Sequence, residues 1–116
     1  MPEPTVTRKA LLAAALGERT VTSVDVREIS LAPGQQTGRH LHPCPVIGYI
    51  VSGAAVLEIE GRPPQPLPAG AAFYEPADTV IARFDNASGT EPMTFIACYL
   101  LRGSEELIQM LNAEQR

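Results

Sequence analysis

His40 and His42 are the only histidines in this 116-residue chain, and a single residue separates them. Successive side chains of a β-strand point to opposite faces, so on a strand both imidazoles would project from one face, about 7 Å apart. Neighbouring imidazole nitrogens of this kind are ligands that divalent transition metals favour in proteins. The spacing therefore predicts a site in which the two histidines act together.

Short segments of β-branched and apolar residues surround the histidine pair, and Gly and Pro interrupt them at close intervals. Many short strands with frequent turn residues are typical of an all-β sandwich or barrel. A slip in the alternation between Val26 and Ile29 predicts a bulge in the first strand. The predicted strands cover residues 20–31, 46–52, 54–60, 71–75, 79–84 and 93–101.

Helical patterns occur only towards the two ends of the chain. Residues 8–17 are rich in Ala and Leu, which favour one or two helical turns ending at Gly17. After residue 103, Ser104 is a suitable N-cap and two glutamates follow in the first turn. An apolar stripe completes that second pattern, made by Leu107, Met110 and Leu111. We therefore expect a short C-terminal helix that covers one face or mouth of the barrel.

The composition fits one globular domain with 45% hydrophobic residues. We expect its net charge of −4, which is spread thinly and forms no basic stripe, to disfavour nucleic-acid binding. No segment reaches the roughly 18 apolar residues of a membrane span, so no membrane partner is expected. The predicted parts are an N-terminal arm (residues 1–19), a barrel (20–103) and the C-terminal helix (104–116).

Two cysteines, Cys44 and Cys98, lie far apart in the sequence and form no C-x-x-C pair. The sequence therefore indicates no disulfide framework. Reduced thiols are typical of cytoplasmic proteins, and we expect that location here.

The segment from Gly34 to Gly53 resembles the first cupin motif, G-x5-H-x-H-x3–4-E-x6-G. Both glycines, both histidines and their spacing fit, and Tyr49 stands where cupins often carry a tyrosine. Residues 61–86 resemble the second motif through Gly61, Pro68-Ala69-Gly70 and Asn86. The resemblance implies a cupin-type antiparallel β-barrel, which is a double-stranded β-helix or jelly roll.

Two positions depart from the ligand set that the resemblance implies. Metal-binding cupins typically hold iron, manganese, nickel or zinc with three histidines and one glutamate. Counting back from Gly53 places Val46 where that glutamate belongs, and alignment on Asn86 places Ile81 where the third histidine belongs. Both replacements are apolar, so they would make the cavity less attractive to a divalent ion.

Glu75 is the best candidate for a replacement ligand, because it ends a predicted strand beside the second-motif turn. With His40 and His42, its carboxylate would complete a 2-His-1-carboxylate set suited to iron(II). The alternative is that Glu75 caps a turn or pairs with Arg83. In that case the two histidines would line a metal-free apolar pocket.

Five further side chains are predicted to line the pocket: Val46, Tyr49, Ile81, Arg83 and Cys44. Cys44 continues the alternation of the two histidines, and Arg83 would offer a positive charge to an anionic ligand at the barrel mouth. The structural alternative for Cys44 is a small hydrophobic side chain in the core.

Three functions fit these features. The first is a metal-dependent cupin enzyme, a dioxygenase or isomerase acting on a small organic substrate, with one ion of iron, manganese, nickel or zinc. The second is a non-catalytic ligand-binding or sensing barrel without metal, and the third is a purely structural partner protein. The resemblance also implies a homodimer, because single-domain cupins commonly pair through N-terminal strands and residues 20–31 would leave an edge that needs cover.

Overall fold

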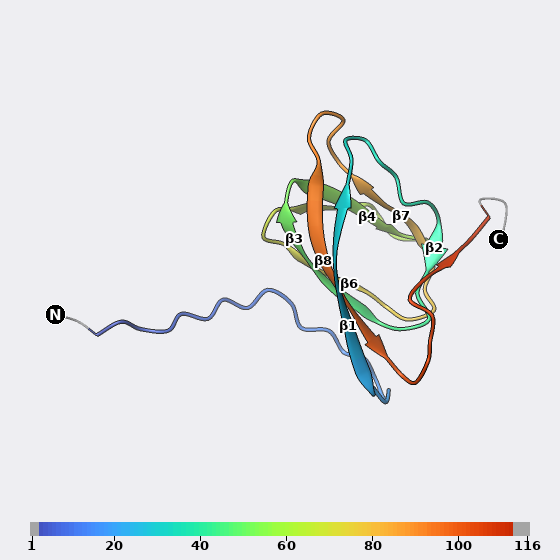
Figure 1. Ribbon diagram of the computed structural model, residues 1–116, viewed down its shortest axis with the longest axis horizontal. Helices are drawn as coiled ribbons and strands as arrows, with labels where there is room; N and C mark the ends of the chain where they lie inside the picture. The colour runs from blue at the N-terminus through green and yellow to red at the C-terminus, as the bar shows by residue number, and fades with distance from the viewer. Residues whose placement is uncertain (1–2, 113–116) are drawn as a thin grey trace.

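The computed structural model describes residues 3–112, and this part of the chain forms nine β-strands and no helix. The strands are β1 (Ser23–Leu31), β2 (His40–Leu41), β3 (Val46–Ser52), β4 (Ala54–Ile59), β5 (Gln65–Pro68), β6 (Ala72–Glu75), β7 (Ile81–Asn86), β8 (Met93–Leu101) and β9 (Gln109–Met110). One sheet has the order β1-β8-β3-β6 and the other β5-β4-β7-β2-β9 (Figure 1). Every strand pairing is antiparallel. The predicted all-β jelly roll is confirmed.

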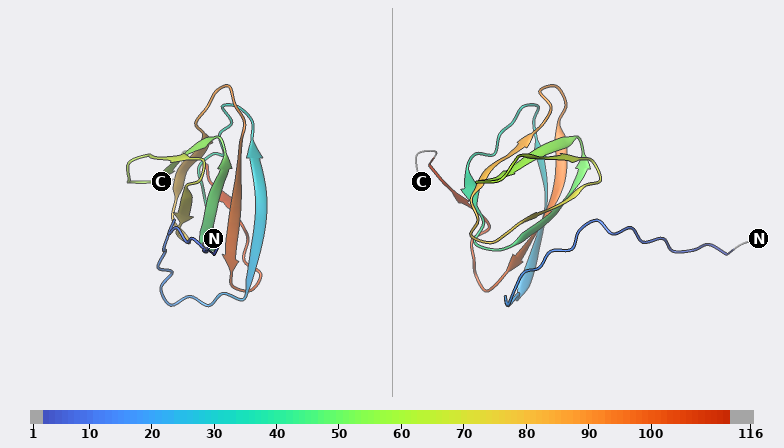
Figure 2. Two further views of the ribbon diagram at one scale, coloured as in Figure 1. Left: turned by 90° about the vertical axis from the view of Figure 1, so that its left-hand side faces the viewer. Right: turned by 180° about the vertical axis from the view of Figure 1, so that it is seen from behind.

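The two sheets lie face to face and enclose one hydrophobic core (Figure 2). In β8, Met93, Phe95, Ala97 and Tyr99 are buried and the residues between them are half-buried, so the strand has the period of two expected for a covered face. The three phenylalanines of the chain come from both sheets and pack with ring centroids 4.7–6.0 Å apart. These rings therefore join the sheets at the centre of the barrel.

The bulge predicted in the first strand is wrong. β1 pairs with β8 without interruption from Ser23 to Leu31. The apparent slip arises because β1 carries apolar residues on both faces: Val24 and Val26 point outward, whereas Ile29 and Leu31 point into the core. The register shifts of the two sheets lie elsewhere, in the pairings of β3 with β8 and of β4 with β7.

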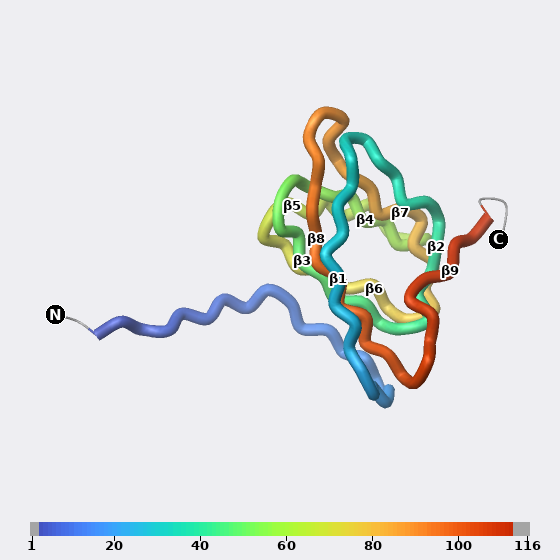
Figure 3. The backbone as a smooth tube through the Cα atoms, in the orientation of Figure 1, coloured from blue at the N-terminus to red at the C-terminus, as the bar shows by residue number. Residues whose placement is uncertain are grey.

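The C-terminal helix is also wrong for residues 104–112, and residues 113–116 lie outside the described part. Instead of coiling, this segment runs back across the barrel, and β9 pairs with β2 (Figure 3). Its backbone obtains partners from the barrel, as in the bond from the Leu111 N–H to the Arg39 carbonyl oxygen. A helix of that length would have been marginal by itself, so pairing with the barrel prevails.

Residues 8–17 form no helix either, and the arm before β1 extends away from the barrel (Figures 1 and 3). Arg19, at the end of this arm, is tied to the body through an ion pair with Glu105 at 2.6 Å. No helix within residues 3–112 is long and apolar enough to cross a membrane.

Gly48 faces the core on β3 at a point that has no space for a side chain. A Cβ atom there would collide with the Phe73 ring and lie 2.7 Å from the Ile96 carbonyl oxygen. We expect Gly48→Ala to lower the free energy of unfolding by about 1–3 kcal/mol, because the backbone and the ring must both shift. Gly89→Ala is the matched control, since that position meets nothing within 4 Å. Urea denaturation measures both, and equal losses in the two variants would contradict the packing at Gly48.

Candidate metal centre

His40 and His42 enter the barrel from β2 and from the residue just after it. Both side chains are buried and line the main cavity, with ring centroids 5.0 Å apart. β2 is only two residues long, but it is fixed on both sides, by β7 through Ile81 and by β9 through Met110. The strand that carries the first imidazole is therefore held between two neighbours.

Glu75 completes a buried group with the two histidines. Its Oε2 atom lies 2.7 Å from Nε2 of His42 and 4.0 Å from Nε2 of His40. One ligand atom from each residue lies within 4.8 Å of the other two. The structure thus brings together the three predicted metal ligands, from β2, the turn after it and β6.

Strand register explains how this carboxylate reaches the histidines. Glu75 of β6, Val46 of β3 and Tyr99 of β8 are direct cross-strand neighbours, and all three are buried. Val46 occupies the position at which the cupin motif has glutamate. The carboxylate therefore comes from the adjacent strand, about 4.8 Å away in the sheet.

The other nitrogen of each imidazole bonds to a backbone carbonyl oxygen. Nδ1 of His40 lies 2.7 Å from the Gly38 oxygen, and Nδ1 of His42 lies 2.6 Å from the Leu107 oxygen. A carbonyl oxygen only accepts, so both Nδ1 atoms donate, and in the neutral rings both Nε2 atoms keep a free lone pair. Metal-binding histidines are oriented by bonds of this kind. These three residues fit a divalent transition metal ion.

The two histidines differ in their affinity for protons. Burial lowers the pKa of His40 below its ordinary value, and its bond to Gly38 and the charge of Glu75 do not compensate. Burial also acts to lower the pKa of His42, but the hydrogen bond to Glu75 and the charge of that carboxylate raise it above its ordinary value. In the metal-free protein, the pKa of His42 therefore lies above that of His40.

The C-terminal strap, residues 102–112, closes one side of the site. Its Leu107 carbonyl holds His42, its Ile108 side chain lines the cavity, and its β9 pairs with β2. The strap is fixed at its start by Glu105, which accepts hydrogen bonds from the Arg19 guanidinium and from its own Arg102 N–H. The orientation of the His42 ring and the acceptor of its Nδ1 proton thus depend on a segment more than sixty residues away in the sequence.

The cavity that His40, His42 and Glu75 line has a volume of about 170 Å³. Apolar and aromatic side chains form most of its wall, and its polar residues are these three candidate ligands, Thr37 and Tyr99. The lining residues are Ile29, Thr37, His40, His42, Val46, Phe73, Glu75, Phe84, Phe95, Ala97, Tyr99 and Ile108.

Of the five further residues predicted for the pocket, Val46 lies in this lining. Ile81 is buried directly opposite His40 but outside the lining, and Cys44 is a fully buried, unpaired core residue. Tyr49 is 41% exposed on the outer face of β3, because the neighbouring positions of that strand point inward. Arg83 bonds Glu58 at 3.1 Å, so the proposed pairing of Glu75 with Arg83 is wrong.

Sequence reasoning missed Ile108. The alternation of β8 contains the signal for Tyr99, since that residue is in phase with Phe95 and Ala97, and the structure places it in the lining. Ile108 gives no such signal, because its segment has a helical pattern and reaches the cavity only through pairing with the distant β2.

The sequence matches the family described as Cupin domain over residues 27–99, which is more than half of the chain. The chain belongs to the cupin family. No protein with a curated description matches it.

Several solved structures have a similar fold. A DMSP lyase from Ruegeria pomeroyi superimposes with a TM-score of 0.68 at 20% identity, over 81% of this chain and 46% of the lyase. A cupin-like protein from Thermotoga maritima superimposes with a TM-score of 0.66 at 22% identity, over 76% of this chain and 64% of that protein. A protein with a double-stranded β-helix domain from Klebsiella pneumoniae superimposes with a TM-score of 0.64 at 21% identity, over 80% of this chain and 79% of that protein. This cupin thus spans about half the length of the lyase, and at these identities the likeness concerns the fold.

In the metal-free protein we expect the His42 imidazole to stay protonated to a higher pH than the His40 imidazole. Histidine nitrogen resonances followed by NMR over a pH titration would measure both pKa values. Glu75→Gln should lower the pKa of His42, because the hydrogen bond and the charge that raise it are lost. A higher pKa at His40 than at His42 would contradict the assigned hydrogen bonds.

The same shifts predict opposite effects on stability. The His42–Glu75 pair stabilises the fold below the ordinary histidine pKa of about 6.5, and this contribution is lost as the pH rises through the raised pKa. The contribution of His40 is present above about 6.5 and is lost as the pH falls towards its lowered pKa.

Proposed function

We propose that this cupin binds one divalent transition metal ion through His40, His42 and Glu75 and uses it to act on a small organic substrate. The observation that carries the proposal is the convergence of two Nε2 lone pairs and one carboxylate in a buried group. Bound there, the ion would supply open coordination positions and Lewis acidity. Iron is the first candidate, with manganese, nickel and zinc as the others.

The chain's own residues would bind and shield the substrate. Most of the cavity wall is apolar, and the Leu107 and Gly38 carbonyls keep both imidazoles in the tautomer that presents Nε2. The Tyr99 hydroxyl is held in its protonated form, because burial and then the charge of Glu75 raise its pKa. Tyr99 is therefore a hydrogen-bond donor at the edge of the site.

The reaction is a dioxygenation or an isomerisation in our proposal, since two histidines and one carboxylate leave positions open for substrate and oxygen. The structural relatives include a lyase and an oxalate oxidase crystallised with glycolate. Because one fold supports these different reactions, the fold itself does not choose among them.

A metal-free ligand-binding barrel is the second candidate. The observation that favours it is the 2.7 Å contact between His42 and Glu75, which satisfies both side chains without an ion. Metal binding would have to replace this contact. The two candidates therefore differ in whether a metal ion competes successfully with a proton on His42.

Calorimetric titration of untagged protein with iron(II), manganese, nickel and zinc tests the metal site. We expect binding of at least one ion, and we expect Glu75→Gln to weaken it at least tenfold, about as much as His42→Ala, since each removes one ligand. Asp85→Asn is the control, because Asp85 is a buried carboxylate outside the ligand group. If no ion binds, the ligand-binding barrel becomes the better description. An unchanged affinity in Glu75→Gln would exclude that residue as a ligand.

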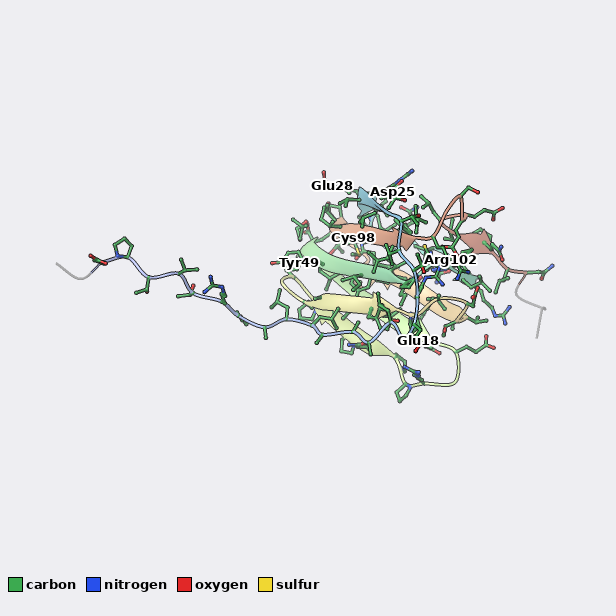
Figure 4. The ribbon with its side chains drawn as sticks, turned by 90° about the horizontal axis from the view of Figure 1, so that it is seen from below. Glu18, Asp25, Glu28, Tyr49, Cys98 and Arg102 are labelled. Atoms are coloured by element: carbon green, nitrogen blue, oxygen red, sulfur yellow. The ribbon has the colours of Figure 1, made fainter. Side chains whose placement is uncertain are left out.

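We also propose that the protein forms a two-fold homodimer through the outer face of the sheet β1-β8-β3-β6. A row of apolar and aromatic side chains crosses all four strands, made by Val26, Cys98, Ile47 and Tyr74. Figure 4 shows Cys98 and Tyr49 on neighbouring strands of this sheet. Val26 is exposed and the other three are half-buried, and a partly exposed apolar face of this kind supports association with another protein surface.

The unpaired cysteines support a reducing compartment such as the cytoplasm.

Val26→Glu tests the homodimer, because this residue lies on the edge strand and is 62% exposed. Sedimentation equilibrium should give about twice the 12.4 kDa mass of one chain for the natural protein and a lower mass for the variant. Met110→Glu, at an exposed position of the other sheet, should leave the mass unchanged. A monomeric natural protein at micromolar concentration would contradict this proposal.

A further inference from the structure

The cavity has a polar end and an apolar body, and strand register sets their order. The row formed by Glu75, Val46 and Tyr99 lies at the metal group. Two residues along the same strands, about 7 Å from the first row, the next row of core-facing side chains contains Phe73 of β6 and Ala97 of β8. Phe84 and Phe95 pack against Phe73 beyond it. A ligand that reaches from the metal group into the cavity therefore meets aromatic rings.

Charge limits the ligand as strongly as shape does. Among the described residues that line the cavity, none is Lys or Arg, and Glu75 is the only carboxylate. The nearby arginines are engaged elsewhere, Arg39 with Glu60 and Arg83 with Glu58. A divalent ion and one carboxylate leave a single positive charge, which balances one negative charge on the ligand. A second negative charge in the aromatic part would be buried without a partner.

The volume of the cavity limits the size of the ligand. The cavity measures about 170 Å³, and an apolar cavity of about 150 Å³ holds one benzene molecule. Ile108 is the only residue of the C-terminal strap in the lining, and it is 41% exposed. Ile108 is not among the residues of the hydrophobic core, so a larger side chain at this position changes the cavity lining and not the core packing.

From these three observations we propose that the ligand of this cupin is a compact molecule of about benzene size, with an apolar body and one oxygen-bearing end of at most one negative charge. The oxygen-bearing end faces His40, His42 and Glu75, and the body contacts the phenylalanine rings. Ile108 sets the upper limit of its size. This inference rests on the proposed metal site for the polar end, and on the cavity itself for the apolar body.

The test uses the untagged, zinc-loaded protein and three probes: benzoate, acetate and succinate. We expect benzoate to bind at least tenfold more tightly than acetate, which has no apolar ring, and than succinate, which carries a second charge. Titration calorimetry measures all three. Succinate or acetate binding as tightly as benzoate would overturn the inference while leaving the metal site intact.

Ile108→Phe should weaken benzoate binding at least tenfold and leave acetate binding unchanged, because the new ring occupies the space of the ligand body. Ser104→Phe is the matched control, since Ser104 lies on the same strap, is exposed and does not line the cavity. Equal benzoate affinities in the natural protein and in Ile108→Phe would exclude Ile108 as the residue that limits size.

Zinc content separates failure of the proposed function from failure of this inference. If the protein takes up no zinc, the metal site is excluded, and the metal-free protein is titrated with benzyl alcohol instead. Binding that Ile108→Phe removes and Ser104→Phe preserves would then support the apolar ligand class. No binding of benzyl alcohol would overturn it.

Discussion

Glu75 is an acidic side chain with only 3% of its surface exposed, and the arrangement of the site follows from its need for partners. Its carboxylate contacts Nε2 of His42 at 2.7 Å and faces Nε2 of His40 at 4.0 Å. Each imidazole must in turn place its Nδ1 proton on an acceptor, and backbone carbonyls provide both. The buried charge is thus connected to the backbone at Gly38 and Leu107 through two rings.

Through these hydrogen bonds, the C-terminal strap and the arm before β1 both help to position the site. Leu107 belongs to the C-terminal strap, whose position depends on β9 and on the ion pair between Glu105 and Arg19. Arg19 comes from the arm that precedes the barrel, and its guanidinium also donates to the Pro43 carbonyl oxygen beside His42. Segments at opposite ends of the sequence therefore meet next to one ligand.

The apolar half of the cavity has a separate physical basis. Three phenylalanines from β6, β7 and β8 join the two sheets, and their rings form the wall that a ligand body would contact. The same packing stabilises the barrel and gives the cavity beside His40, His42 and Glu75 a mostly apolar wall. Metal-binding cupins typically use four ligands, whereas this chain brings together three candidate ligands beside a mostly apolar cavity.

The sequence by itself determined the fold class and named the three side chains that form the buried candidate group. Two histidines in alternation, glycines and prolines between short strands, and one acid at the end of β6 are local patterns, and local alternation fixes which side chains share a face. Tertiary structure decided the rest. The helical pattern of residues 104–112 gave way to pairing with β2, because the barrel offers backbone partners that no local pattern records. Tyr49 and Arg83 point away from the cavity, although the sequence predicted them in its lining. The direction of each side chain depends on which face of its strand the other sheet covers, and the local sequence does not state that. The cavity lining at Ile108 and the bond from His42 to Leu107 join residues far apart in the chain, and only the folded barrel brings them together.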